Sequence, residues 1–372
     1  MNDGNSKEAF FALLKAGLWK QNVRISAFEP IDFAALYDLA DGQSVVGLVA
    51  AGLEQVVDRK ITKPEALPFM KRVFSLEGRN ASMNEFIGTI VGKMRDAGIY
   101  TLLVKGQGVA QCYARPQWRS SGDIDFFLDA RNYELAKSFL RPMADSCGSE
   151  EEYTKHFGLE IKPWEVELHG TLRCGLSSRV DRGIDAIQED TFSRGNIRTW
   201  RNGETDIFLP GADNDIVLTF THILNHFYLG GIGLRQICDW CRLLWTYRET
   251  IDSGLLERRL REMGLTSEWK AFGALAVDYL GMPAEAMPLY DASAGWSRKA
   301  RRICAFILKV GNFGKNRDLS YYRKYPYLVR KTISLGQRLG DLARHALIFP
   351  LDSFRFLPNI LFHGFEAAVK EK

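Results

Sequence analysis

The chain lacks the roughly 18 consecutive apolar residues that a membrane-spanning helix needs, and it lacks a basic-then-apolar leader at its start. The first absence excludes a conventional spanning helix, and the second predicts that no signal peptide is present. Cysteine is sparse, with six residues scattered along 372, which is not the density of a secreted disulfide scaffold. We therefore expect a reduced, soluble, cytoplasmic protein.

Two motifs that often mark metal or redox sites are incomplete. Cys238 and Cys241 form one C-x-x-C inside a helical pattern, without a second pair or a preceding redox-type strand, so a structural role is predicted. His222 and His226 lie four residues apart but lack the glutamate of an H-E-x-x-H motif. We interpret these histidines as structural or substrate-lining rather than as zinc ligands.

The composition is that of an ordinary globular protein, with 46% apolar and 25% charged residues. The net charge of +4 is small, but it is unevenly spread. Between Arg298 and Arg344 the chain is rich in lysine and arginine and contains only two acids, Asp318 and Asp341. The remainder of the chain is therefore acidic on balance.

Changes in hydrophobic period divide the chain into four predicted regions. We expect an N-terminal helical region (1–98), an α/β core (99–210), a helical domain (211–295) and a basic, aromatic C-terminal segment (296–372). Within the first region, helical spacing predicts helices over 7–20, 32–57 with a break at Gly42, and 69–97, the last following a junction marked by Pro64 and Pro68.

The central feature is Asp123-Ile124-Asp125, two carboxylates inside an apolar run. On a strand, residues i and i+2 point to the same face, so the two carboxylates are expected side by side. Adjacent like charges resist ionisation unless a cation lies between them, and Mg²⁺ is a cation that prefers carboxylate oxygens. The alternative is a solvated strand edge, but aspartate is depleted in strands, which favours the metal site.

A strand signal over 99–104 ends at Lys105-Gly106, and residues 107–113 can form a short helix. A strand, a glycine turn and a helix start together make a phosphate-binding corner, to which Lys105 adds charge. The alternative is a plain strand-to-helix turn.

Later strands are predicted over 157–161 and 164–168, on either side of Lys162-Pro163. The second strand carries Glu165 and Glu167 on one face. A third carboxylate beside the aspartate pair can bind a second ion or accept a proton from an attacking hydroxyl. A solvated strand face is the alternative, and for Glu165 it is the preferred interpretation.

The remainder of this stretch, 171–210, reads as irregular apart from a hairpin near 199–209 with an Asn-Gly turn. From Asp213 the period returns to that of helices and predicts four of them up to about residue 282.

The segment LLVKGQGVAQCYARPQWRSSGDIDFFL resembles the DNA polymerase β-type nucleotidyltransferase superfamily. More closely, the chain resembles the bacterial family usually labelled uncharacterised nucleotidyltransferases. The residues that carry the resemblance are Lys105, Gly106, Tyr113, Pro116, Arg119, Asp123, Ile124, Asp125, Glu167, Leu168, His169, His222 and Asp239. The superfamily turn is commonly Gly-Gly or Gly-Ser, from which Lys105-Gly106 departs.

The resemblance implies an α+β fold with a polymerase β-like core, a small mixed sheet with flanking helices, set between N-terminal and C-terminal helical regions. It implies Mg²⁺-dependent transfer of a nucleoside monophosphate from an NTP, expected to be ATP, to an acceptor hydroxyl of a sugar, small molecule, protein or RNA. Asp123, Asp125 and Glu167 are the implied catalytic and metal ligands, for one Mg²⁺ ion or two. The implied phosphate and pocket residues are Lys105, Gly106, Gln107, Arg119, Ser120, Ser121, His169, His222, His226 and Asp239.

The C-terminal segment leaves alternatives open. The run from Tyr321 to Tyr327 interleaves aromatic and basic residues, which suits contact with nucleic acid or with an anionic membrane surface, and which also occurs on solvated helix faces. The competing function is therefore a non-catalytic nucleotide- or nucleic-acid-binding protein on the same scaffold, and a further variant is an enzyme docked peripherally at the inner membrane surface.

Overall fold

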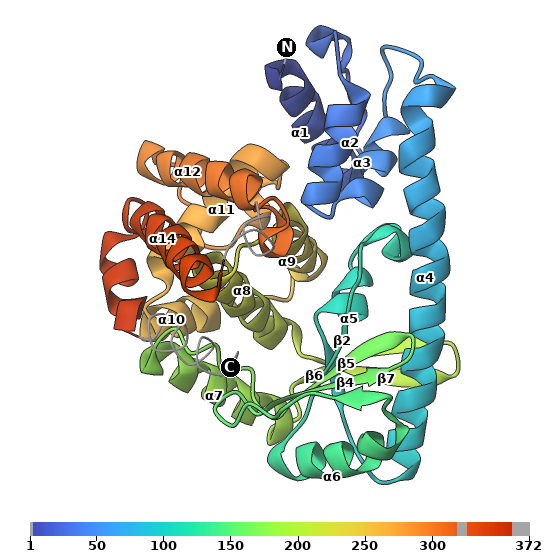
Figure 1. Cartoon of the computed structure of the whole chain (residues 1–372), viewed down its shortest axis with the longest axis vertical. Helices are drawn as coiled ribbons and strands as arrows, with labels where there is room; N and C mark the ends of the chain where they lie inside the picture. Colours follow the sequence, from blue (N-terminus) through green and yellow to red (C-terminus); the bar gives the residue numbers. More distant parts are fainter. Residues whose placement is uncertain (1–2, 318–325, 359–372) are drawn as a thin grey trace.

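The computed structural model describes residues 3–317 and 326–358 (Figure 1). Three short helices open the chain, α1 (Asp3–Trp19), α2 (Phe33–Gly42) and α3 (Val46–Leu53). They lie beside one end of the long helix α4 (Lys63–Asp96), whose other end lies against the sheet (Figure 1). Helix α4 therefore links the N-terminal helices to the strands that carry the predicted site.

Helix α4 begins six residues before the predicted start at Phe69, so the interpretation of Pro64 and Pro68 as a junction is wrong. Thr62 and Glu65 form a capping box, in which the Glu65 carboxylate accepts the Thr62 backbone N–H at 2.8 Å. Pro64 falls in the first turn, where backbone N–H groups lack intrahelical partners and a missing N–H costs little. Only Pro68 removes an interior hydrogen bond, and the length of α4 tolerates that loss.

The strands form one mixed seven-stranded sheet in the order β3-β4-β5-β2-β1-β7-β6. The two central pairs that matter for the site are β2 with β5, which is parallel, and β1 with β2, which is antiparallel. This mixed sheet with flanking helices agrees with the predicted α+β class. The strands are β1 (Leu102–Val104), β2 (Ile124–Phe127), β3 (Ser146–Cys147), β4 (His156–Ile161), β5 (Trp164–His169), β6 (Ile197–Asn202) and β7 (Thr205–Pro210).

The two faces of the sheet differ in chemistry because side chains alternate along each strand. Ile124, Phe126, Val166 and Leu168 pack in one apolar cluster with residues of α4 and of α6 (Ala130–Leu140). The alternate residues of β2 and β5 therefore lie on the opposite face, and they include the predicted carboxylates. Helix α4 forms the support for the strands, and the chemistry lies on the far side of the sheet.

The interpretation of 171–210 as largely irregular is wrong, because α7 (Ser178–Phe192) occupies much of it. Its buried apolar stripe is narrow, consisting of Val180, Ile184 and Ile187, and the sequence around it is strongly charged. The Ser177 hydroxyl caps the helix by accepting the Val180 N–H. The predicted hairpin follows, but its two-residue loop is Gly203-Glu204 rather than the predicted Asn-Gly turn, because Asn202 already pairs with Thr205.

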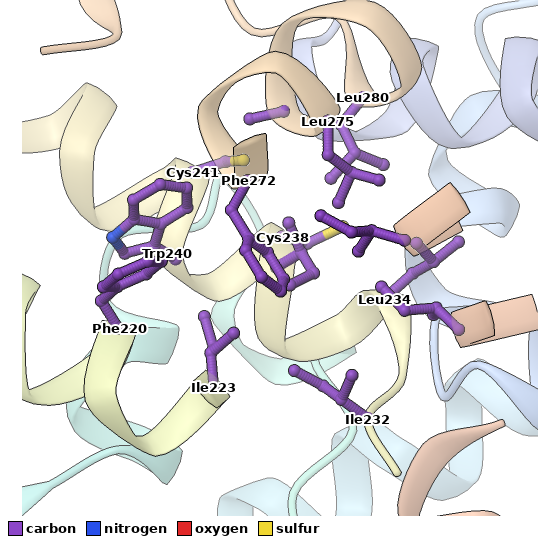
Figure 2. Packing of buried hydrophobic residues seen from close by; sticks show 14 of the residues in the cluster. Phe220, Ile223, Ile232, Leu234, Cys238, Trp240, Cys241, Phe272, Leu275 and Leu280 are labelled. Carbon is purple, nitrogen blue, oxygen red and sulfur yellow. The ribbon is translucent and has the colours of Figure 1, made fainter. Parts of the chain in front are cut away.

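The predicted helices after Asp213 are present as α8 (Ala212–Leu229), α9 (Leu234–Tyr247), α10 (Ser253–Met263) and α11 (Thr266–Leu280). They pack around a dense apolar core in which Phe220, Trp240 and Phe272 lie together (Figure 2). Cys238 and Cys241 are buried free cysteines within this core, in agreement with the structural role predicted for them (Figure 2).

The chain continues through α12 (Ala294–Val310) and α14 (Tyr327–Ala346), with further helix over 350–358. One hydrophobic cluster contains Leu13, Phe69, Trp240, Ile307 and Phe349, which come from the first, third and fourth predicted regions. The division into four regions stays a prediction. The basic aromatic run that starts at Tyr321 lies, up to residue 325, outside the described residues. Among the helices of the described part, none is long and apolar enough to cross a membrane.

Candidate active site

The sheet brings the three predicted carboxylates together. Asp123 directly precedes β2, Asp125 lies in β2, and Glu167 lies opposite Asp125 on the parallel neighbour β5. One oxygen from each of these carboxylates lies within 4.8 Å of the other two. Asp125 is buried, and Asp123 and Glu167 are half-buried, so the group opens to solvent on one side. We refer to these three residues as the acid triad.

Lys105 lies among the carboxylates rather than in a separate phosphate corner. It follows β1, where Val104 pairs with Asp125, and its Nζ lies 2.7 Å from Asp125 Oδ1. Its backbone has φ 56°, a conformation that non-glycine residues seldom adopt. Burial acts to lower the pKa of Lys105, but the Asp125 carboxylate outweighs this and raises it. Lys105 thus stays charged, and it neutralises part of the triad.

Gly106 and Gln107 open a helix of only five residues, α5 (Gly106–Ala110). The Gln107 side chain does not face the triad, because it is buried and donates to Asn80 Oδ1 at 2.8 Å. Of the groups of Gln107, only the backbone N–H is therefore left for the predicted contact with a phosphate.

Two histidines border the triad. His169 Nε2 lies 2.9 Å from Asp125 Oδ1 and 3.4 Å from Glu167 Oε2. His156 Nε2 lies 3.2 Å from the same Glu167 oxygen. His169 belongs to the predicted set, whereas His156 was missed. The predicted hairpin could have identified His156. A turn at Lys162-Pro163 pairs Ile161 with Trp164, and this register places His156 opposite His169.

The three carboxylates have different affinities for protons. The charge on Asp125, together with burial, raises the pKa of Asp123 above its ordinary value. Burial also acts to raise the pKa of Asp125 and of Glu167, but Lys105 and the neighbouring histidines outweigh it, so both pKa values lie below the ordinary range. Asp123 is therefore the triad residue whose ionised form a bound cation would stabilise most.

Two pockets meet at the triad. The first, which we name the α9 pocket, has a volume of about 230 Å³ and is lined by Lys105, Gly106, Val109, Arg119, Asp123, Asp125, Glu167, Thr219, His222, Ile223, His226, Arg235, Gln236, Asp239 and Phe313. The second, the β4 pocket, has a volume of about 200 Å³ and is lined by Val104, Lys105, Glu151, Thr154, His156, Glu167, His169, Thr171, Leu172, Arg173, Cys174, Asp215, Leu218, Thr219, His222 and Asn225. Lys105, Glu167, Thr219 and His222 line both. All three triad residues line the α9 pocket, and Glu167 is the triad residue that also lines the β4 pocket.

Arg119 and Asp239 form a buried ion pair at the edge of the α9 pocket. Arg119 donates through Nε and Nη2 to the two Asp239 oxygens at 2.7 and 2.8 Å, and the Tyr113 hydroxyl donates to Asp239 Oδ1 at 2.7 Å. Arg119 Nη1 donates to the Ser120 carbonyl and to the Ser121 hydroxyl. The pair thus fixes the loop that leads into Asp123, and Arg119 has little capacity left for a ligand.

His222 and His226 come from α8, with ring centres 4.3 Å apart. Burial, followed by the charge of Lys105, lowers the pKa of His222 well below its ordinary value and that of His226 to about 4. Both rings are therefore neutral near neutral pH and line the α9 pocket, as predicted. Neither belongs to the clusters of described residues whose atoms are placed to bind a metal.

Arg235 and Phe313 line the α9 pocket and were also missed. Arg235 lies one turn before Asp239 on α9, so the helical period alone can place both on one face. Phe313 has no such signal. It lies in the turn after α12 with φ 50°, leaves 54% of its surface exposed, and contacts His226 with ring centres 4.9 Å apart.

Comparison with known proteins agrees with this geometry. A family model described as uncharacterised nucleotidyltransferase matches residues 29–281, a range that contains the triad, both histidine pairs and the Arg119–Asp239 pair. The chain belongs to this family, and it is therefore a nucleotidyltransferase by membership. No curated protein and no solved structure matches the chain.

Proposed function

We propose that the acid triad binds Mg²⁺ and that the protein transfers a nucleoside monophosphate from an NTP to an acceptor hydroxyl. The observation that carries the proposal is the meeting of three carboxylate oxygens within 4.8 Å, on neighbouring parallel strands, in a chain of a nucleotidyltransferase family. The donor set fits the ion, because Mg²⁺ takes oxygen ligands, often one or two carboxylates together with substrate phosphates. When bound, Mg²⁺ supplies stabilisation of the charge that develops on the phosphate oxygens.

Glu167 serves in this proposal as a ligand rather than as a general base. Its pKa lies below the ordinary range, because His156 and His169 outweigh the effect of burial. A carboxylate held ionised in this way is a weak proton acceptor and a good cation ligand. Of the two roles considered for Glu167, the electrostatics favour metal binding.

The α9 pocket is the proposed nucleotide side. Lys105 and Arg235 supply positive charge for the triphosphate. The rings of His222 and His226 line the same pocket and are neutral, because burial lowers their pKa values. The exposed ring of Phe313 offers a surface on which a nucleobase can stack, an interaction that tolerates any base. We take ATP as the nucleotide to test first.

The proposed role of Arg119 changes in the light of its contacts. Its guanidinium is paired with Asp239 through both of that residue's oxygens, so a direct contact with the leaving pyrophosphate is disfavoured. Arg119 instead positions Ser120 and Ser121, whose loop leads to Asp123. Arg235 reinforces this by donating to the Ser120 carbonyl at 2.8 Å.

The β4 pocket is the proposed acceptor side. Its lining contains Thr154, Thr171, Asp215 and Asn225, groups that can hydrogen-bond to the hydroxyls and amines of an acceptor. An acceptor hydroxyl entering from this side reaches Glu167 and Lys105, the residues shared with the nucleotide side. Nucleotidyl transfer requires the acceptor oxygen to approach in line with the leaving pyrophosphate, and two pockets that share Glu167 and Lys105 support that arrangement.

The test is to follow two labels of ATP in the presence of Mg²⁺ and a panel of sugars, amino alcohols, RNA and the protein itself. The proposal predicts that an α-phosphate label moves to an acceptor while a γ-phosphate label leaves as pyrophosphate. Asp123→Asn should abolish transfer, and Glu165→Gln, an exposed carboxylate on the same strand as Glu167, should leave it unchanged. Movement of the γ label to an acceptor, or equal transfer by Asp123→Asn, would overturn the proposal.

A further inference from the structure

His156, Glu167 and His169 form a second cluster beside the acid triad. One nitrogen or oxygen from each of these side chains lies within 4.8 Å of the other two. The cluster shares Glu167 with the triad but replaces the two aspartates by two imidazoles. We propose that it binds a second divalent ion of the kind that accepts nitrogen ligands, such as Zn²⁺ or Mn²⁺.

The two contacts to Glu167 are long for hydrogen bonds, whereas the contact from His169 Nε2 to Asp125 Oδ1 has a hydrogen-bond length of 2.9 Å. Both histidines direct Nε2 at the same oxygen, Glu167 Oε2, at 3.2 Å and 3.4 Å. A hydrogen bond from a ring N–H to a carboxylate is usually shorter, about 2.7–2.9 Å. Ligands about 2.0–2.1 Å from a tetrahedral zinc ion are separated from one another by about 3.3–3.4 Å. The two separations from Glu167 match two edges of such a site, and the two histidine nitrogens lie within 4.8 Å of each other.

The hairpin builds this cluster in a rigid way. His156 and His169 are directly paired across β4 and β5, and Glu167 is paired with Gly158. The ligands therefore come from two paired strands of the sheet rather than from mobile loops.

The cluster also has an open side. All three residues line the β4 pocket, so an ion held there keeps coordination positions directed toward the proposed acceptor. Three protein ligands with an open position are typical of catalytic rather than structural zinc sites. The donor types separate the two metal positions, since the triad has oxygens only and suits Mg²⁺, whereas imidazole suits Zn²⁺. The inference does not depend on nucleotidyl transfer and stands if that activity is absent.

The experiment is a calorimetric titration with Zn²⁺ in the presence of excess Mg²⁺. The protein is the whole chain without a tag, treated beforehand with a chelator to remove bound metal. Every variant carries Cys147→Ser, because Cys147 is an exposed thiol that can bind zinc by itself. We expect one zinc ion to bind, and His156→Gln to weaken its binding at least about tenfold, since one of three protein ligands is lost. Asp123→Asn, which removes a triad ligand outside the cluster, should leave zinc binding unchanged.

A second readout is spectroscopic. Co²⁺ in place of Zn²⁺ should give visible absorption bands of a nitrogen-ligated ion in the Cys147→Ser protein and in Asp123→Asn, and these bands should be lost in both His156→Gln and His169→Gln. Circular dichroism establishes that each variant is folded. Zinc binding that is equal with and without His156, or that falls as much in Asp123→Asn as in His156→Gln, would overturn the proposal.

Discussion

At the scale of single residues, the Arg119–Asp239 pair is a deeply buried charge interaction of the site region, with 6% and 5% of these residues exposed. Burial acts to raise the pKa of Asp239, but Arg119 outweighs it and the pKa lies below its ordinary value. Each charge thus depends on the other for compensation.

We predict that Asp239→Asn lowers the free energy of unfolding by about 3–5 kcal/mol, because it leaves the Arg119 guanidinium buried without its anion. Urea denaturation followed by circular dichroism measures the change. Glu204→Gln is the control, since Glu204 pairs with Arg201 on the exposed β6–β7 hairpin and its loss should have no measurable effect. A loss of under about 1 kcal/mol in Asp239→Asn would show that the pair contributes little.

The second prediction at this scale concerns Phe313. If it stacks on the nucleobase, Phe313→Ala should raise the KM or Kd for the nucleotide about tenfold, because base stacking contributes about 1–3 kcal/mol. Phe313→Trp should retain affinity. Phe354→Ala is the matched control, since Phe354 is also an exposed phenylalanine, at 79%, and does not line the α9 pocket. Equal effects of the two alanine variants would exclude a specific stacking role.

The sequence was informative about residues that share a strand and less so about residues brought together from different elements. The spacing of Asp123 and Asp125 and the position of Glu167 grouped the triad correctly, because strand alternation acts over two residues. His156 required the hairpin register, whereas the helical period of α9 was enough to place Arg235 on the same face as Asp239. Phe313 lies 190 residues after Asp123 and 146 residues after Glu167, and no local period connects it to the triad.

At the scale of elements, α1 and α3 pack through glycines. A Cβ at Gly52 would overlap with the carbonyl oxygen of Leu13, and a Cβ at Gly17 would overlap with that of Leu48. The two helix backbones therefore approach more closely than any larger residue allows. This contact holds α1 and α3 to each other within the N-terminal region.

Gly52→Ala should consequently destabilise the protein by about 1–3 kcal/mol, the usual cost of overpacking. Gly78→Ala provides a matched control, because Gly78 is exposed in the middle of α4 and a Cβ there meets nothing within 4 Å. That substitution should stabilise by about 0.5–1 kcal/mol through helix propensity. Thermal unfolding distinguishes them, and changes of the same sign would contradict the assigned packing.

The element pattern also shows why some helices were predicted and others were not. Helices α8, α9 and α11 bury apolar residues on wide faces and were found by period alone, and α10 was found although its buried residues are Leu256, Leu260 and Met263. Helix α7 buries a stripe of three aliphatic residues amid charges, and it depends on the Ser177 cap and on contact with α10, where Gly183 lies against Met263. Tertiary packing of this kind leaves a weak trace in the sequence.

At the scale of the whole molecule, the C-terminal helix α14 packs on the large hydrophobic core and buries its own His345 there. The ring is 1% exposed and packs against Phe227, Tyr228 and Phe306. Burial lowers the pKa of His345 to about 3. At pH values between about 3 and the ordinary histidine pKa of about 6.5, this histidine binds a proton in the unfolded chain but not in the folded protein.

Stability should therefore be unaffected by His345 above about pH 6.5 and should fall as the pH drops below it, by about 2 kcal/mol at pH 5 for this residue. The unfolding free energy of the wild type and of His345→Gln, measured at pH 7.5 and 5.0, tests this, and the variant should lose less on acidification. His156→Gln serves as control, because Glu167 raises the pKa of His156 and its removal should act in the opposite direction. Identical pH dependence in wild type and His345→Gln would contradict the burial of a neutral ring.

The central claim is that the acid triad binds the metal that carries the nucleotide. Calorimetric titration of a non-hydrolysable ATP analogue, with and without Mg²⁺, tests it most directly in wild type, Asp125→Asn and Glu165→Gln. We predict Mg²⁺-dependent binding by the wild type and by Glu165→Gln, and its loss in Asp125→Asn while the variant remains folded. Mg²⁺-dependent binding that survives Asp125→Asn, or binding that needs no metal and instead weakens steeply with salt in favour of polynucleotide, would contradict the account.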